Sequence, residues 1–148
     1  MANGVVQDPY TNYSFLIELD NIVRASFRQV SGLESTIDVI ENPEGGRSVI
    51  TKMAGRTKYA NIVLRWGIDA DRELYEWHRQ ISLDPSSLPA QRRGGAILLM
   101  NTRGETVARW DFERAWPCKY TAGDFNAETE AIAVETVELA HEGVHRVL

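Results

Sequence analysis

His141, Glu142 and His145 spell H-E-x-x-H near the end of the sequence, a pattern that binds zinc and activates water in metallopeptidases. That chemistry requires a helix, on which histidines four residues apart share one face beside the glutamate that acts as general base. Residues 131–141 (AIAVETVELAH) are instead rich in β-branched side chains, which predicts a strand. On a strand the two histidines are separated by about 13 Å and cannot share one ion. The sequence therefore predicts no metal site here and leaves a zinc hydrolase only as an alternative.

Other combinations of reactive side chains do not indicate an enzyme either. The sequence has no G-x-x-x-x-G-K-[ST] phosphate loop and no G-x-S-x-G nucleophile turn. The carboxylates of the segment ETEAIAVETVEL predict a solvated strand face, and His78 is expected to be a packing residue on a helix. Cys118 is the single cysteine, so it cannot form an intramolecular disulfide and is expected to be a small, partly buried hydrophobic residue. We therefore expect no catalytic residue and no cofactor.

Length and charge indicate a single globular domain over residues 1–148. Hydrophobic residues make up 43% of the chain and charged residues 25%, a balance that allows an adequate core. The net charge of -5 and the pI near 5.2 disfavour binding to nucleic acid or to an anionic membrane by bulk electrostatics. The lone cysteine fits a reducing compartment, and no segment has the character of a signal peptide or a membrane span. Synthesis in the cytoplasm is the expectation.

Hydrophobic periodicity predicts a mainly β fold with one α-helix. Apolar and polar residues alternate at strand period along several segments, most clearly 13–19 and 59–67. At about residues 70–81 the period becomes helical, with a stripe formed by Leu74, Trp77, His78 and Ile81. The patterns predict roughly eight strands, of which AWPCKY is expected at an edge because its proline lacks a ladder donor. A β-barrel or two-sheet sandwich is the expected architecture, because closure removes edge strands.

One long segment shows no period. Residues 42–58 (NPEGGRSVITKMAGRTK) are rich in glycine and basic side chains, and they predict a long loop. Loops of this length in a compact domain are usually functional or mobile. We therefore expect this loop to carry contacts to other molecules.

Several phrases of the sequence, in this order, carry a resemblance to a known family. The most specific are SGLE (31–34), KYANIVLRWG (58–67), RWDFERAWPCKY (109–120) and ELAHEG (138–143). From about Asp8 to Gly143 the chain resembles the tail tube proteins of contractile phage tails, a family that includes the inner tube proteins of extracellular contractile injection systems. It is also similar to the haemolysin-coregulated protein of type VI secretion. The resemblance implies that HEG belongs to a family signature without a metal role.

The resemblance further implies how such a protein works. Six copies would form a hexameric ring whose sheets join into one inner wall, and rings would stack into a hollow tube. A sheath would surround the tube, baseplate or spike and cap proteins would bind its ends, and cargo or DNA would pass through its lumen. The protein would then be a structural component of an assembled tail or injection particle. The alternatives within this fold are a tube cap, initiator or terminator, or a secreted carrier like the haemolysin-coregulated protein; a ligand-binding β-barrel is a further one.

The expected assembly contacts lie in the long loop and near the end of the chain. The basic side chains of the loop are expected to pair with acidic groups such as Glu128 and Glu130 of a neighbouring copy, although exposed pairs contribute only about 0–1 kcal/mol each. The full set of candidate contacts is Asn42, Pro43, Gly45, Gly46, Lys52, Gly55, Arg56, Lys58, Tyr59, Glu128, Glu130, His141 and Glu142.

Overall fold

The computed structural model describes residues 13–20, 22–43, 45–46, 48–68, 71–123, 128 and 133–148. The expected contact residue Glu130 lies outside these residues. In chain order the elements are β1 (Ser14–Leu19), β2 (Ile22–Ser31), β3 (Ser35–Asn42), β4 (Thr51–Tyr59), β5 (Ile62–Gly67), α1 (Glu73–Leu83), the 3-10 turn η1 (Pro85–Ser87), α2 (Leu88–Gln91), β6 (Arg93–Met100), β7 (Thr106–Ala122), β8 (Val134–Ala140) and β9 (Gly143–Arg146).

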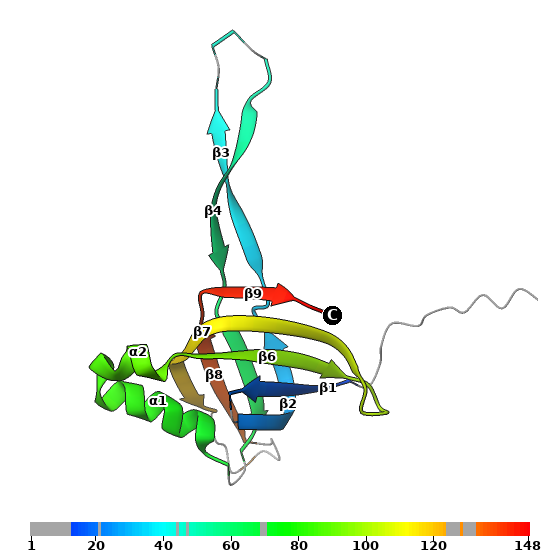
Figure 1. Ribbon diagram of the computed structural model, residues 1–148, viewed down its shortest axis with the longest axis vertical. Coiled ribbons are helices and arrows are strands. Elements are labelled where there is room, and N and C mark those ends of the chain that lie inside the picture. The colour runs from blue at the N-terminus through cyan, green and yellow to red at the C-terminus, as the bar shows by residue number, and fades with distance from the viewer. Residues whose placement is uncertain are drawn as a thin grey trace, which may run out of the picture.

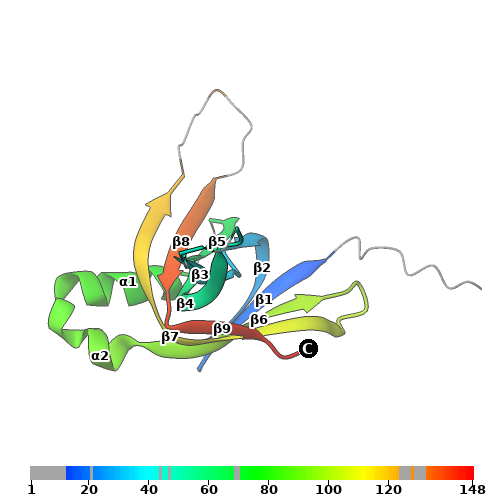
Figure 2. The same ribbon diagram turned by 90° about the horizontal axis from the view of Figure 1, so that it is seen from above.

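Six of the strands close into an antiparallel barrel (Figures 1 and 2). Their order is β6, β1, β2, β5, β8 and β7, and a second pairing of β7 with β6 completes the circuit. The 17-residue strand β7 makes this possible, because its first half pairs with β6 and its second half with β8. The short strand β9 continues the sheet beyond the first half of β7. The expected barrel is thus the observed architecture.

The barrel interior is filled by side chains whose alternation is visible in the sequence. Ile17 and Leu19 of β1 are fully buried, and so are Ile62 and Leu64 of β5. Trp66 extends the β5 row and meets the Phe27 ring edge to face at 5.8 Å. The predicted strand faces of segments 13–19 and 59–67 are therefore confirmed. Ile97, Phe112, Ala115, Val137 and Leu139 complete the buried set from the other strands.

The helix α1 covers part of the barrel, at residues 73–83 rather than the predicted 70–81. Leu74, Trp77 and Ile81 are buried as the stripe predicts, and the Trp77 indole N–H donates to the Gln91 carbonyl at 2.8 Å. The fold has a second, four-residue helix that the sequence analysis missed. It arises because the prolines of LDPSSLPAQ stand in the first turns of η1 and α2, where the missing N–H is not needed.

Two strand predictions need correction. AWPCKY is not a separate edge strand but the interior of β7, where buried Pro117 coincides with a register shift in the pairing with β8. The irregular pairing leaves the strand intact without the proline donor. The last predicted strand, 131–141, is observed over 134–140, and a further strand that the sequence did not indicate, β9, follows it.

Residues 42–58 are not a long loop. Their second half is strand β4, which pairs with β3 along its whole length and leaves a short tip at 43–50. The period is hidden for two reasons. A bulge sets one residue of β3 against two of β4 between Ile37 and Val39, and most side chains on both faces are exposed, so polar and apolar residues need not alternate.

Candidate functional site

The hairpin of β3, its tip and β4, residues 35–59, forms an arm that projects from the barrel (Figure 1). The arm extends the β2–β5 hairpin, since β2 leads into β3 and β4 leads into β5. Its large apolar side chains are exposed; Val39, for example, is 63% exposed. Most of the exposed large apolar side chains among the described residues lie here: Ile37, Val39, Ile40, Val49, Ile50, Met53 and Tyr59. An apolar surface of this kind marks a contact with another molecule.

The pairing register sorts the arm into two faces. Ile37 lies opposite Thr57 and Val39 opposite Ala54, so this face is uncharged along its inner half. The other face carries Ile40 opposite Met53 toward the tip and charged groups toward the barrel. There Lys58 Nζ lies 3.1 Å from Asp38 Oδ2, and Arg56 occupies the bulge beside them.

The arm leaves the barrel through an elbow, the turn formed by residues 32–34 and 60–61. Gly32 has a φ of +85°, and a Cβ placed on it would lie 1.9 Å from the carbonyl oxygen of Asn61. A residue with a Cβ at this position would force the backbone of one of the two elbow segments to move. Gly32, in the phrase SGLE, is thus the point at which segments 32–34 and 60–61 come into contact.

His141 fastens the elbow to the barrel. Its Nε2 donates to the Ala60 carbonyl at 2.8 Å, and its ring lies 5.7 Å from the ring of Tyr59. Nearby, the Asn61 amide contacts the Cys118 sulfur at 3.6 Å, and burial raises the pKa of that thiol. The phrases KYAN and ELAHEG therefore converge on one place in the fold.

Glu142, next to His141, forms ion pairs with two further segments of the chain. One carboxylate oxygen lies 2.9 Å from Arg92 Nη1, and the other lies 2.7 Å from Arg114 Nε. Arg114 has a positive φ of 51° at the point where β7 passes from its partner β9 to its partner β8. The backbone N–H of Glu142 donates to the Glu113 carbonyl at 3.0 Å.

The H-E-x-x-H pattern is therefore not on a helix. His141 and Glu142 form the bend between β8 and β9, and His145 lies in β9. The structure brings together no three His, Cys, Asp or Glu residues, within its described ranges, that could hold a metal ion. Glu142 faces two arginines, an arrangement suited to fixing the bend.

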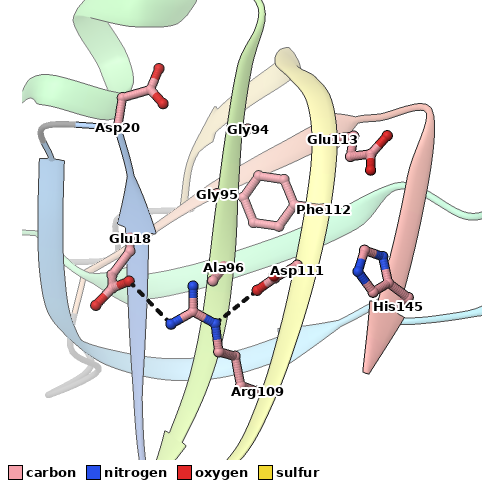
Figure 3. Close-up of a pocket in the computed structure, with 10 residues that line it drawn as sticks. All are labelled: Glu18, Asp20, Gly94, Gly95, Ala96, Arg109, Asp111, Phe112, Glu113 and His145. Carbon is pink, nitrogen blue, oxygen red and sulfur yellow. Dashed lines mark hydrogen bonds and ion pairs between the residues drawn. The ribbon is translucent and has the colours of Figure 1, made fainter. Parts of the chain in front are cut away.

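A groove crosses the outer face of β1, β6, β7 and β9 (Figure 3). Arg109 stands in it between two carboxylates, with its Nε 2.8 Å from Asp111 and its Nη1 3.7 Å from Glu18. The hydrogen bond to Asp111 raises the pKa of the Arg109 guanidinium, which stays charged. Gly94 leaves part of the floor of the groove without a side chain, whereas a Cβ on Gly95 would point inward, toward Phe112 and Leu19. Acidic residues dominate the lining.

The other half of the barrel, β2, β5, β8 and the end of β7, presents a polar outer face. Arg65 lies opposite Thr136, and Val63 opposite Glu138. Lys119 Nζ lies 3.7 Å from the Glu138 carboxylate. No described helix is long and apolar enough to span a membrane.

One carboxylate of the expected solvated face is buried. Glu135 is only 7% exposed and accepts a hydrogen bond from the Tyr120 hydroxyl at 3.0 Å. Burial of the Tyr120 ring and the bond to Glu135 raise the pKa of Tyr120 to about 12. Because β8 alternates, residues 135, 137 and 139 point inward, and only the intervening carboxylate of Glu138 faces outward.

The expected contact residues that the structure describes fall into four places. Asn42, Pro43, Gly45 and Gly46 lie at or beside the tip; Lys52, Gly55, Arg56 and Lys58 lie on β4; and the rings of Tyr59 and His141 lie together beside the elbow, with Glu142 next to His141 in the bend. Glu128 lies in the sequence between β7 and β8, and the strand ends that flank it, Ala122 and Val134, lie with Gly67 at the end of the barrel opposite the arm. Sequence reasoning missed the apolar arm residues Ile37, Val39 and Met53, the elbow residue Gly32, and the two arginines that pair with Glu142, Arg92 and Arg114. The phrase SGLE contained the signal for the glycine.

The fold and the site define a class of protein: a closed antiparallel barrel that displays an amphipathic hairpin, as a subunit of a larger assembly does. Comparison with known families makes the assignment specific. Residues 11–145 match the family of the T4-like virus tail tube protein gp19, and the chain belongs to this family. No curated protein sequence matches the chain.

Solved structures agree with this assignment. The chain is similar to a protein of the sheath–tube complex of the extracellular contractile injection system PVC, with 29% identity and a TM-score of 0.82, over 96% of this chain and 93% of that one. It is equally similar to a protein of the anti-feeding prophage cap, with 29% identity and a TM-score of 0.82, over 99% of both chains. Hcp1 from Flavobacterium johnsoniae shares the fold, with 15% identity and a TM-score of 0.58, over 90% of this chain and 94% of that one.

Proposed function

We propose that this chain is a structural subunit of the inner tube of a contractile injection system or phage-like tail, without enzymatic activity. Six copies form a ring, and rings stack into a hollow tube. The observation that carries the proposal is the arm, whose apolar residues Ile37 and Val39 are more than half exposed on the single chain. Closure of a six-fold ring requires heterologous contacts between neighbouring copies. Separate contacts between stacked rings repeat without limit and give a filament.

The polarity of the chain supports stacking in one direction. The arm leaves one end of the barrel, and the strand ends that flank Glu128 in the sequence, Ala122 and Val134, lie at the other end. When rings stack head to tail, Lys52, Arg56 and Lys58 of one ring approach Glu128 and Glu130 of the next. Exposed pairs of this kind contribute about 0–1 kcal/mol each, so they orient a contact whose affinity comes from the apolar residues.

The polar sheet face is the surface suited to the lumen. Arg65, Thr136 and Lys119 lie on it, so that cargo or DNA passes over polar side chains. The opposite outer face, with the acidic groove, is left for sheath contacts, while baseplate or spike and cap proteins bind the tube ends. The protein is made in the cytoplasm and acts in the assembled particle.

Electron microscopy of the purified protein over a concentration series tests the proposal. Stacked rings or tubes are the expected result, and deletion of residues 45–55 should shorten or abolish them. A monomeric field at every concentration, or tubes of unchanged length after the deletion, would contradict self-driven assembly through the arm.

A single-ring cap or terminator is the second candidate. Its support is the similarity to a sheath/tube terminator of PVC, with 28% identity and a TM-score of 0.82, over 97% of this chain and 99% of that one. Such a protein forms one ring that caps tubes made by another chain. Isolated rings that do not stack at high concentration would favour this candidate over the tube subunit.

A further inference from the structure

Residues 141–142 connect parts of the molecule that are far apart in the sequence. His141 binds Ala60, which is 81 residues away, and Glu142 binds Arg92, which is 50 residues away. Glu142 also binds Arg114, at the bend of β7. One short bend thus holds the elbow of the arm, the start of β6 and the middle of β7 in a fixed relation.

These contacts differ from those of the barrel core. The His141 bond is partly buried, and its Nδ1 is buried without a hydrogen-bond partner, so the ring is held by Nε2 and by the Tyr59 ring. The side chains of Glu142 and Arg114 are 51% and 58% exposed, and such ion pairs add little to the stability of a fold. What distinguishes these ion pairs is their position next to His141, which contacts the elbow, and not their strength.

We propose that His141 and Glu142 are positioning residues for assembly, which act by holding the arm at one angle to the barrel. The arm projects into solvent and is joined to the barrel at its base (Figure 1). Gly32 allows the two chains of the elbow to approach, but it supplies no side chain to fix their direction. The hydrogen bond from His141 to Ala60 supplies that restraint, and the two arginines paired with Glu142 fix the bend that carries His141. The use of the arm rests on the proposed tube function; its angle does not.

The test measures the arm angle directly. The full chain, with Cys118→Ser, carries spin labels at Val49→Cys on the tip and Leu83→Cys on α1, two sites that are 73% and 71% exposed. Labelled protein is diluted with unlabelled protein, and the distance between the labels is measured by pulsed electron resonance. A narrow distribution is expected for this parent, and a broader, shifted one for His141→Ala and for Glu142→Gln.

The matched controls are a second histidine of the H-E-x-x-H pattern and a glutamate of β7 near the bend. His145→Ala and Glu113→Gln change residues of the same type near the bend that lie in the outer groove, and both should keep the narrow distribution. His141→Gln retains an N–H donor and should restore part of the narrowing lost in His141→Ala. An unchanged distribution in both His141→Ala and Glu142→Gln would overturn the proposal. If His141→Ala loses its near-ultraviolet circular dichroism, Glu142→Gln alone decides between the two results.

Tube assembly by the same variants separates this proposal from the function of the tube. If the parent forms tubes and the elbow variants form rings that stack poorly, both proposals hold. If the parent never assembles but the elbow variants still broaden the distance distribution, the tube function fails and the positioning role stands. If assembly is normal and the distances are unchanged, only the positioning role fails.

Discussion

Leu64 and Val39 both belong to the long β2–β3/β4–β5 hairpin, yet Leu64 is fully buried and Val39 is 63% exposed. In the barrel half, the strands enclose their apolar face, so these side chains are buried within a single chain. In the arm half, β3 and β4 make a sheet of only two strands, which cannot cover either face. The same antiparallel pairing therefore encloses a core in one half and leaves apolar side chains exposed in the other, where the proposed function uses them for contacts. The elbow is the boundary between the two halves.

The largest effect is expected in the barrel. Leu64→Ala should lower the free energy of unfolding by about 2–5 kcal/mol, because the site is enclosed and leaves a cavity. Denaturant unfolding measures the loss. Leu83→Ala, at a leucine that is 71% exposed, is the control and should change little. Equal losses in the two variants would contradict the burial assigned to Leu64.

The elbow should show the next largest effect. Gly32→Ala should cost about 1–3 kcal/mol from its positive φ alone, and more from the clash with Asn61. Gly104→Ala is the matched control, because Gly104 has a φ of +79° with nothing within 4 Å of its added Cβ. Denaturant unfolding of both variants separates the cost of backbone strain from the cost of the clash with Asn61. If the two elbow segments are in contact, Gly32→Ala should lose clearly more unfolding free energy than Gly104→Ala.

A smaller effect concerns the buried polar pair in the barrel. The folded pKa of Tyr120 is raised to about 12 from an ordinary value of 10, so the neutral phenol favours folding. The stabilisation is complete below pH 10 and is lost as the pH rises toward 12. Tyr120→Phe should flatten the decline of unfolding free energy in this alkaline window. A decline of equal slope in the parent and in Tyr120→Phe would show that Tyr120 is not its source.

The smallest change in stability, but a large one in assembly, is expected in the arm. The double variant Ile37→Ser and Val39→Ser should alter the unfolding free energy of the monomer by less than about 0.5 kcal/mol, since both side chains already face water. Electron microscopy should show that its tubes are lost. Leu83→Ser, at an exposed apolar residue of α1, should assemble normally. Normal tubes from the double variant would remove the arm from the assembly contact.

The same contrast decides what the sequence could predict. Inside the barrel, Ile17 and Leu64 alternate with outward residues because one face is dry, so period alone identifies the strands. On β4 both faces meet solvent, and the bulge near Gly55 and Arg56 breaks the alternation, so the strand was predicted as a loop. Burial in one environment leaves a local signal, and exposure on two sides does not.

The elbow shows a second limit. The contact of His141 with Ala60 spans 81 residues, and no local pattern specifies such a pairing. The resemblance nevertheless singled out SGLE, KYAN and ELAHEG as family phrases, and the structure places parts of all three at the elbow. Those phrases indicated importance without indicating position, which requires the folded backbone.

The closed order of strands has a mechanical consequence. A force along the arm enters the barrel through the ends of β2 and β5, which pair with each other and have β1 and β8 as their outer neighbours. Because antiparallel hydrogen bonds lie across the strands, such a pull loads a whole ladder of bonds in shear at once instead of peeling them one by one. In a tube that is driven through an envelope, force would then pass from ring to ring through the hydrogen-bond ladders of β2 and β5, which are loaded in shear and resist separation.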